Sequence, residues 1–192
     1  MDNQFYAVLS RMKYINRWAL MRNMQTETVW EHSYDVAVLA HALAALTNHR
    51  FGGTVNVEQC VLLALYHDAT EIFTGDMPTP VKYHSDSLRD AYRQVEALAA
   101  DRLLAMLPPD LREDYRPLLL PEASGLELRL VKAADKLSAL LKCPAELAQG
   151  NREFESARRS IEASLRALSL PAADCFLEEF LPAFTRTLDE QS

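Results

Sequence analysis

The sequence predicts an all-α protein in which residues 1–192 form a single helical bundle of about six or seven helices. Apolar residues recur every three or four positions along most of the chain, whereas strand-like alternation is not sustained anywhere. Five glycines are few for 192 residues, which disfavours an all-β protein with many tight turns. The chain is 49% apolar and 24% charged, and these ordinary values for a globular protein exclude a disordered chain.

The first half of the chain is predicted to contain three helices. Residues 5–12 form a short one. Thr28 and Glu31 form a capping box, in which each side chain satisfies a free amide of the first turn of a second helix, ending near residue 47. Asn56 can cap a third helix, which we expect to continue through the dipeptide at residues 67–68.

Residues 74–80 are predicted to form a stiff loop, because two prolines and a glycine disfavour regular helix. A helix at 87–107 follows and is stopped by two prolines, and short turns occupy 110–123. Three more helices are predicted. The first runs from a possible capping box at Ser124 and Glu127 to about Leu147, with Gly150 at its C-terminal end. The second covers residues 154–168, and the third begins near Ala172 and bends near Pro182.

Charge and cysteine content limit the partners and the compartment. The formal charge of −7 disfavours nonspecific binding to a nucleic-acid polymer, although a small anionic substrate remains compatible with it. Cys60, Cys143 and Cys175 form no CxxC pair, and reduced thiols in a cytoplasmic protein are the simplest interpretation. We expect no membrane association, because no apolar run approaches the ~18 residues needed to span a bilayer and the N-terminus does not resemble a signal peptide.

Four metal-ligand candidates lie on three predicted helices: His32 on the second, the dipeptide His67 and Asp68 on the third, and Asp135 on a later one. Two neutral imidazoles and two carboxylates are a suitable set for one divalent transition metal with positions left for water. Glu71 lies four residues after His67 and three after Asp68, so we expect all three along one side of the third helix.

Each candidate also has a simpler interpretation from the sequence alone. His67 and Asp68 could be an ordinary structural pair, and His32 could be a satisfied core histidine. Asp135 could lie at the surface beside Lys132 and Lys136. A carboxylate within an apolar stripe is costly to bury without a compensating cation or several donors, which keeps the metal interpretation open.

The motif segments together resemble the HD-domain metal-dependent phosphohydrolases, and most closely the bacterial YfbR-type 5'-deoxynucleotidases. The resemblance runs from the first helix to the last and is dense over residues 15–83. Trp30 departs from it, because a small residue is expected beside the metal histidine. The segments that carry the resemblance are Ile15–Trp18, Leu20–Asn23, Glu31–Ser33, Tyr66–Glu71, Thr74–Tyr83, Ala134–Asp135 and Leu141–Cys143.

The resemblance implies a single HD domain that hydrolyses deoxyribonucleoside 5'-monophosphates. It implies one divalent transition metal, such as Co²⁺ or Mn²⁺, held by His32, His67, Asp68 and Asp135. Only His84 falls between Asp68 and Asp135, so the additional histidines of a two-metal site are missing. The chemistry is consistent, because hydrolysis of a phosphomonoester dianion requires charge neutralisation and an oriented water.

Roles for seven further positions are consistent with the same resemblance. Arg17 would orient the phosphate with its planar guanidinium, and Glu71 would act as an acid, a base or a positioner of water. Trp18 would lie against the sugar and exclude a 2'-hydroxyl. The segment Asp76, Met77, Pro78 and Thr79 would meet the sugar 3'-hydroxyl or the phosphate side, while the metal ligands complete the substrate site.

Alternative functions remain open at this point. One is another HD phosphohydrolase, acting on dNTPs or cyclic nucleotides, although the motif segments offer few basic residues beyond Arg17 and Arg22 for a polyphosphate. A second is a noncatalytic helical module that binds a partner protein, which has no chemical need for the ligand series or Glu71. The resemblance also implies a homodimer, for which the apolar C-terminal segment could supply an interface.

Overall fold

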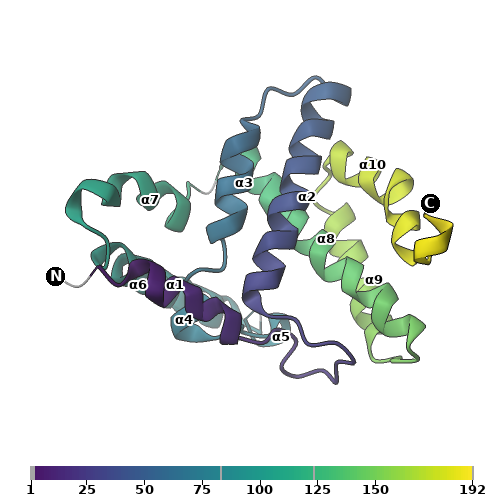
Figure 1. Ribbon diagram of the computed structural model, residues 1–192, viewed down its shortest axis with the longest axis horizontal. Helices are drawn as coiled ribbons and strands as arrows, with labels where there is room; N and C mark the ends of the chain where they lie inside the picture. The colour runs from purple at the N-terminus through teal and green to yellow at the C-terminus, as the bar shows by residue number, and fades with distance from the viewer. Residues whose placement is uncertain (1–2, 83, 123, 192) are drawn as a thin grey trace. The chain divides into compact units, whose positions relative to one another are not determined.

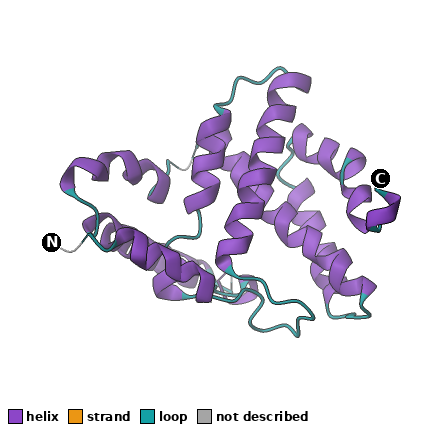
Figure 2. Cartoon of the chain, in the orientation of Figure 1, coloured by secondary structure: helices purple, strands orange, loops and turns teal. Residues whose placement is uncertain are grey.

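The computed structural model describes residues 3–82, 84–122 and 124–191 and consists of helices joined by loops (Figures 1 and 2). The all-α prediction is confirmed: over these residues there is no strand, and one isolated antiparallel bridge joins Asn16 and Thr28. The chain groups into two compact units. The first comprises Met1–Arg22, Thr26–Tyr34 and Leu65–Ala123, and the second Asn23–Gln25, Asp35–Ala64 and Ser124–Ser192.

The first unit is built on a core of apolar side chains around α6. Phe5, Ala69, Leu103 and Leu107 are almost wholly buried there. Its elements are α1 (Phe5–Leu9), the 3-10 helix η1 (Ser10–Tyr14), α4 (Glu71–Thr74), α5 (Thr79–Lys82), α6 (Asp86–Ala105), the 3-10 helix η2 (Pro109–Leu111) and α7 (Arg112–Leu119). Because α4 and α5 each contain only four residues, packing rather than helix propensity must stabilise them.

Two long helices begin in one unit and continue in the other: α2 (Val29–Arg50) and α3 (Val57–Tyr66). In the second unit, α8 packs against α9 and α9 against α10. The remaining elements are α8 (Leu126–Ala148), α9 (Phe154–Arg166), α10 (Pro171–Glu179) and the 3-10 helices η3 (Leu181–Thr185) and η4 (Leu188–Glu190). Among the described helices α2, α3 and α6 to α10 have eight residues or more, in agreement with the predicted number.

Three predicted helix boundaries are confirmed by their hydrogen bonds. Glu31 Oε2 accepts from the Thr28 amide at 2.7 Å, and Thr28 Oγ1 accepts from the Glu31 amide at 3.2 Å, which completes the capping box. Asn56 Oδ1 accepts from the Gln59 amide at 3.0 Å at the start of α3. Gly150 follows α8 with φ +83°, a conformation that favours glycine.

Three other predictions are corrected by the structure. The second capping box is wrong, since Gly125 precedes α8 and Glu127 Oε1 instead accepts from the Asn56 amide at 3.2 Å. The last helix does not bend at Pro182: α10 ends at Glu179 and a 3-10 helix follows, because proline cannot continue an α-helix. The stiff loop ends earlier than expected, since Thr79 begins α5 with proline tolerated in its first turn.

Within the part of the chain that the structure describes, no helix combines the length and the apolar character needed to cross a bilayer. The grouping into two compact units does not test whether the chain forms one domain, so the single-domain organisation stays a prediction.

Candidate active site and metal centre

Two short extended segments hold the entrance to α2 in place. The bridge between Asn16 and Thr28 is flanked by hydrogen bonds from the Arg17 amide to the Glu27 carbonyl, at 2.8 Å, and from the Val29 amide to the Ile15 carbonyl, at 2.9 Å. This pairing sets Arg17 opposite Glu27, immediately before the first turn of α2. The capping box then starts the helix that carries His32.

The dipeptide His67 and Asp68 lies in a turn rather than on α3, which ends at Tyr66. The Ala69 amide donates to the Tyr66 carbonyl and the Glu71 amide to the Asp68 carbonyl, each at 3.0 Å, so the chain tightens into successive turns. The expectation of one continuous helix through Glu71 is therefore wrong. Ala69 is fully buried in the core of the first unit and anchors this turn.

The first unit brings two imidazoles and a carboxylate together. Asp68 Oδ2 lies 3.1 Å from His67 Nε2 and 3.7 Å from His32 Nε2, and the two imidazole ring centroids are 5.3 Å apart. A tetrahedral ion with bonds of about 2.1 Å separates its ligand atoms by about 3.4 Å, which lies between these two distances. These three residues therefore fit a nitrogen- and oxygen-liganded transition metal. Asp135, the fourth predicted ligand, belongs to α8 of the second unit.

The environment of Asp68 favours its ionised form. Burial opposes ionisation, but the charges of His67, His32 and Arg17, with a hydrogen bond from His67, outweigh it and hold the pKa of Asp68 well below its usual range. An ionised carboxylate is the form that binds a metal ion, so the group is prepared for that role.

The environment of Glu71 has the opposite effect. Burial, together with the negative charges of Asp68 and Asp76, raises the pKa of Glu71 far above its usual range, while Arg17 and Lys82 oppose this shift. Its Oε2 atom is buried and has no hydrogen-bond partner among the residues that the structure describes. Two carboxyl groups three residues apart thus have pKa values pushed in opposite directions, a pattern typical of acid–base sites.

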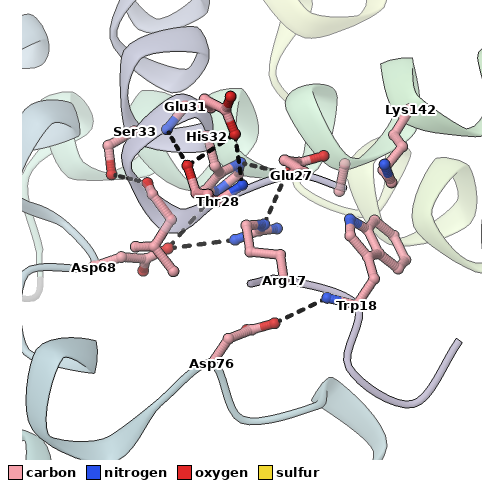
Figure 3. A network of polar contacts seen from close by, with 12 residues as sticks. Arg17, Trp18, Glu27, Thr28, Glu31, His32, Ser33, Asp68, Asp76 and Lys142 are labelled. Atoms are coloured by element: carbon pink, nitrogen blue, oxygen red, sulfur yellow. Dashed lines mark hydrogen bonds and ion pairs between the residues drawn. The ribbon is translucent and has the colours of Figure 1, made fainter. Parts of the chain in front are cut away.

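Arg17 lies between two acidic side chains, those of Glu27 and Asp68 (Figure 3). Its Nε lies 2.9 Å from Glu27 Oε1, and its Nη1 lies 3.4 Å from Asp68 Oδ2. The guanidinium is therefore fixed in orientation beside the metal-ligand candidates, as the phosphate-orienting role requires.

Trp18 and Asp76, two further residues predicted to belong to the site, contact each other. The Trp18 amide donates to Asp76 Oδ2 at 3.2 Å, and Trp18 has φ +62°, which is unusual for a residue with a side chain. Such strain costs about 1–3 kcal/mol and persists only where the surroundings fix it. Met77 and Pro78 are half-buried and Thr79 is exposed, whereas Tyr83 lies outside the described residues.

Glu27 contacts two of the candidate site residues and was not predicted from the sequence. Besides its ion pair with Arg17, its Oε1 atom lies 3.7 Å from His32 Nδ1. The available signal was weak: an acidic residue directly before a capping box. Its partners become visible only when the segments around Asn16 and Thr28 are paired.

An all-helical frame and a site of two histidines and an aspartate define the class of metal-dependent phosphohydrolases of the HD type. An HD-domain phosphohydrolase from Listeria innocua superimposes with a TM-score of 0.83 at 28% identity, over 98% of this chain and 91% of that one. A cyanophage S-2L HD phosphohydrolase, solved with dA and one catalytic Zn²⁺, has a TM-score of 0.68 over 94% and 96% of the chains. At 20% identity that likeness shows the fold alone.

The family is identified by sequence. The family model for YfbR-like 5'-deoxynucleotidases matches residues 4–184. Proteins named 5'-deoxynucleotidase YfbR from Escherichia coli strains, among them SMS-3-5 and SE11, are 51% identical over 192 residues, which is 100% of this chain and 96% of theirs. The chain belongs to the YfbR-like 5'-deoxynucleotidase family, and the resemblance noted in the sequence is confirmed.

Proposed function

We propose that this protein is a metal-dependent 5'-deoxynucleotidase, which hydrolyses deoxyribonucleoside 5'-monophosphates to deoxyribonucleosides and inorganic phosphate. Family membership over the whole chain supports the activity. The observation that carries the proposal is the convergence of His32, His67 and Asp68 beside Arg17, together with the half-buried Glu71 carboxyl that interacts with Asp68 and Arg17. A noncatalytic binding module has no need for this arrangement.

His32, His67, Asp68 and Asp135 are proposed to hold one divalent transition metal. The donor distances around Asp68 support the first three ligands, and Asp135 supplies the second carboxylate that the family resemblance implies. A nitrogen and oxygen set accepts Co²⁺, Mn²⁺ and similar ions. When bound, such an ion polarises a phosphate oxygen and lowers the pKa of a water molecule.

Arg17 is proposed to bind and orient the phosphate. Its guanidinium presents several N–H donors in one plane, so it can hold two phosphate oxygens at once, which a lysine cannot. The contacts with Glu27 and Asp68 fix that plane before substrate arrives, and preorganisation of this kind reduces the entropy lost on binding.

Glu71 is proposed to transfer a proton at Oε2. The group either accepts a proton from the attacking water or donates one to the departing 5'-oxygen. Its raised pKa makes both protonation states available nearer to neutral pH than for an exposed glutamate. No described residue makes a hydrogen bond to Oε2, which leaves that atom available to a reacting group.

Trp18 and the segment Asp76–Thr79 are proposed to contact the sugar. An indole wall gives an added 2'-hydroxyl no hydrogen-bond partner, which favours deoxyribonucleotides by about a hundredfold. Asp76, whose Oδ2 accepts from the Trp18 amide, is proposed to accept from the 3'-hydroxyl. No residue in the motif segments suggests a base-specific contact, so we expect all four nucleobases to be accepted.

We further propose that the protein acts as a homodimer in the cytoplasm, without a nucleic-acid polymer or a membrane as partner. Free Cys60, Cys143 and Cys175 support a reducing compartment. The acidic net charge of −7 supports the absence of polymer binding.

The direct test measures phosphate released from dAMP, AMP and dATP by purified protein loaded with Mn²⁺ or Co²⁺. We expect rapid release from dAMP, with kcat/KM about a hundredfold higher than for AMP, and no conversion of dATP. Equal release from AMP and dAMP would contradict the deoxy-specific function. Conversion of dATP, or of a cyclic nucleotide, would instead favour another HD phosphohydrolase.

A further inference from the structure

Glu27 contacts both a phosphate-binding candidate and a metal-ligand candidate through the same oxygen. Oε1 lies 2.9 Å from Arg17 Nε and 3.7 Å from His32 Nδ1 (Figure 3). The Glu27 side chain is 16% exposed, while those of Arg17 and His32 are 11% and 0% exposed, so water screens these contacts poorly. This arrangement is unlike a surface ion pair, which contributes little.

The position of Glu27 bears on how His32 presents its ring. Nε2 faces Asp68, and Nδ1 faces Glu27 on the other edge of the imidazole. A histidine that binds a metal through Nε2 must carry its proton on Nδ1, and a carboxylate beside Nδ1 stabilises that tautomer. The distance of 3.7 Å is too long for a hydrogen bond, so here the interaction is electrostatic.

The same carboxylate sets the plane of the Arg17 guanidinium. The ion pair engages Nε, and the backbone hydrogen bond from the Arg17 amide to the Glu27 carbonyl, at 2.8 Å, holds the two residues opposite each other. Because Nε lies in the guanidinium plane, this ion pair, although not aligned as a hydrogen bond, favours one direction for the terminal nitrogens. A guanidinium turned out of position loses the bidentate geometry that phosphate recognition needs.

We propose that Glu27 is a positioning residue that couples the metal ligand His32 to the phosphate-binding Arg17. It touches neither the reacting atoms nor the metal, and it acts by fixing the ring of one partner and the guanidinium plane of the other. The Arg17 part of this inference rests on the proposed function. The His32 part requires only that the protein binds a metal.

The test compares Glu27→Gln with wild type in two measurements. Gln is close to isosteric and keeps an acceptor oxygen for Arg17, so the variant should fold even where Glu27→Ala does not. The first measurement is calorimetric titration of metal-free protein with Mn²⁺ alone. We expect a 10–100-fold loss of affinity, the range found when the outer partner of a metal-binding histidine is removed.

The second measurement is a double-mutant cycle on kcat/KM for dAMP at saturating Mn²⁺. Glu27→Gln should lower kcat/KM by at least about tenfold in wild type, but by less than about threefold when Arg17 is already replaced by alanine, because residues that act together are non-additive. The matched control is Glu155→Gln. Glu155 Oε1 pairs with Arg152 Nε at the same 2.9 Å on the surface, and both measurements should stay at wild-type values.

The outcomes distinguish failure of the positioning role of Glu27 from failure of the proposed 5'-deoxynucleotidase activity. A Glu27→Gln variant with wild-type Mn²⁺ affinity overturns the coupling to His32, and equal losses with and without Arg17 overturn the coupling to Arg17. If wild type binds Mn²⁺ but does not hydrolyse dAMP, the proposed function fails while the titration still tests the His32 contact. A lower melting temperature with unchanged affinity and kinetics would show that Glu27 is structural only.

Discussion

Replacing Glu71 with glutamine should lower the activity of the enzyme and raise the stability of its metal-free form. The carboxyl is half-buried and faces the charges of Asp68 and Asp76, and its Oε2 has no hydrogen-bond partner within the described part of the chain. Glutamine has nearly the same shape but cannot ionise. Loss of a positioned acid or base typically costs about 10²–10⁴ in rate.

The stability effect has a defined sign with pH. Because the folded pKa of Glu71 is raised above its unfolded value, the folded protein holds a proton that the unfolded chain releases. The contribution of Glu71 to stability is therefore complete below the unfolded pKa, about 4.3, and is lost as pH rises toward the folded pKa. Glutamine cannot ionise and does not lose stability in this way. The stability of the variant relative to wild type should therefore increase as pH rises from 4 to 8.

The magnitude follows from the cost of keeping the buried carboxyl protonated above its unfolded pKa, at most about 1.4 kcal/mol per pH unit, and relaxation of the site reduces the total to about 1–3 kcal/mol at pH 8. For a chain of this size each kcal/mol moves the melting temperature by about 2–4 °C. Metal-free Glu71→Gln should therefore melt about 2–12 °C above wild type at pH 8, and the two should converge near pH 4. Thermal scans in a chelator, with kcat/KM for dAMP measured on Mn²⁺-loaded protein, test both effects. A variant that keeps full activity, or melts no higher at pH 8, would refute the reasoning.

Three further variants have separate expected outcomes. Asp135→Asn should lower Mn²⁺ affinity by at least 10–100-fold while the metal-free melting temperature stays within about 2 °C; a large drop in melting temperature with unchanged affinity would make Asp135 structural. Trp18→Ala should bring the kcat/KM values for dAMP and AMP toward each other from a ratio of about a hundred, and an unchanged ratio would exclude the indole as the discriminating group. Glu146→Ala should cost about 2–4 kcal/mol, because the buried Glu146 carboxylate accepts from the amides of Met24 and Gln25. A melting temperature less than about 4 °C below wild type would contradict the last expectation.

The parts of the fold that depend on local chemistry could be predicted from the sequence. The capping box at Thr28 and Glu31, the Asn56 cap and the turn at Gly150 each need only neighbouring residues. The similar pattern at Ser124 and Glu127 did not produce a capping box. There the Glu127 carboxylate bonds instead to the amide of Asn56, far away in the sequence, and no local pattern reveals that competing partner.

In the candidate site, too, the features that depend on distant contacts were not predicted from the sequence. The residues around His67 were expected to continue α3, since nothing in Tyr66–Ala69 breaks a helix. The chain turns because Ala69 is buried in a core made with Phe5 and α6, and periodicity alone does not report that packing. Glu27 was missed for a related reason. Its importance arises from the pairing of two short segments that the sequence separates by a loop.

Three of the groups assigned to the chemistry lie at the ends of helices, whereas Asp135 lies within α8. His32 is in the first turn of α2, Asp68 follows the end of α3, and Glu71 begins α4. Helix ends are where several side chains from separate segments can converge on one point, and here two contacts fix the three ends. A capping box holds the first, and the burial of Ala69 holds the second and third. A substitution that loosens one of these contacts should therefore displace the reacting groups that it holds while leaving most of the helical frame intact, so loss of activity should precede loss of helix.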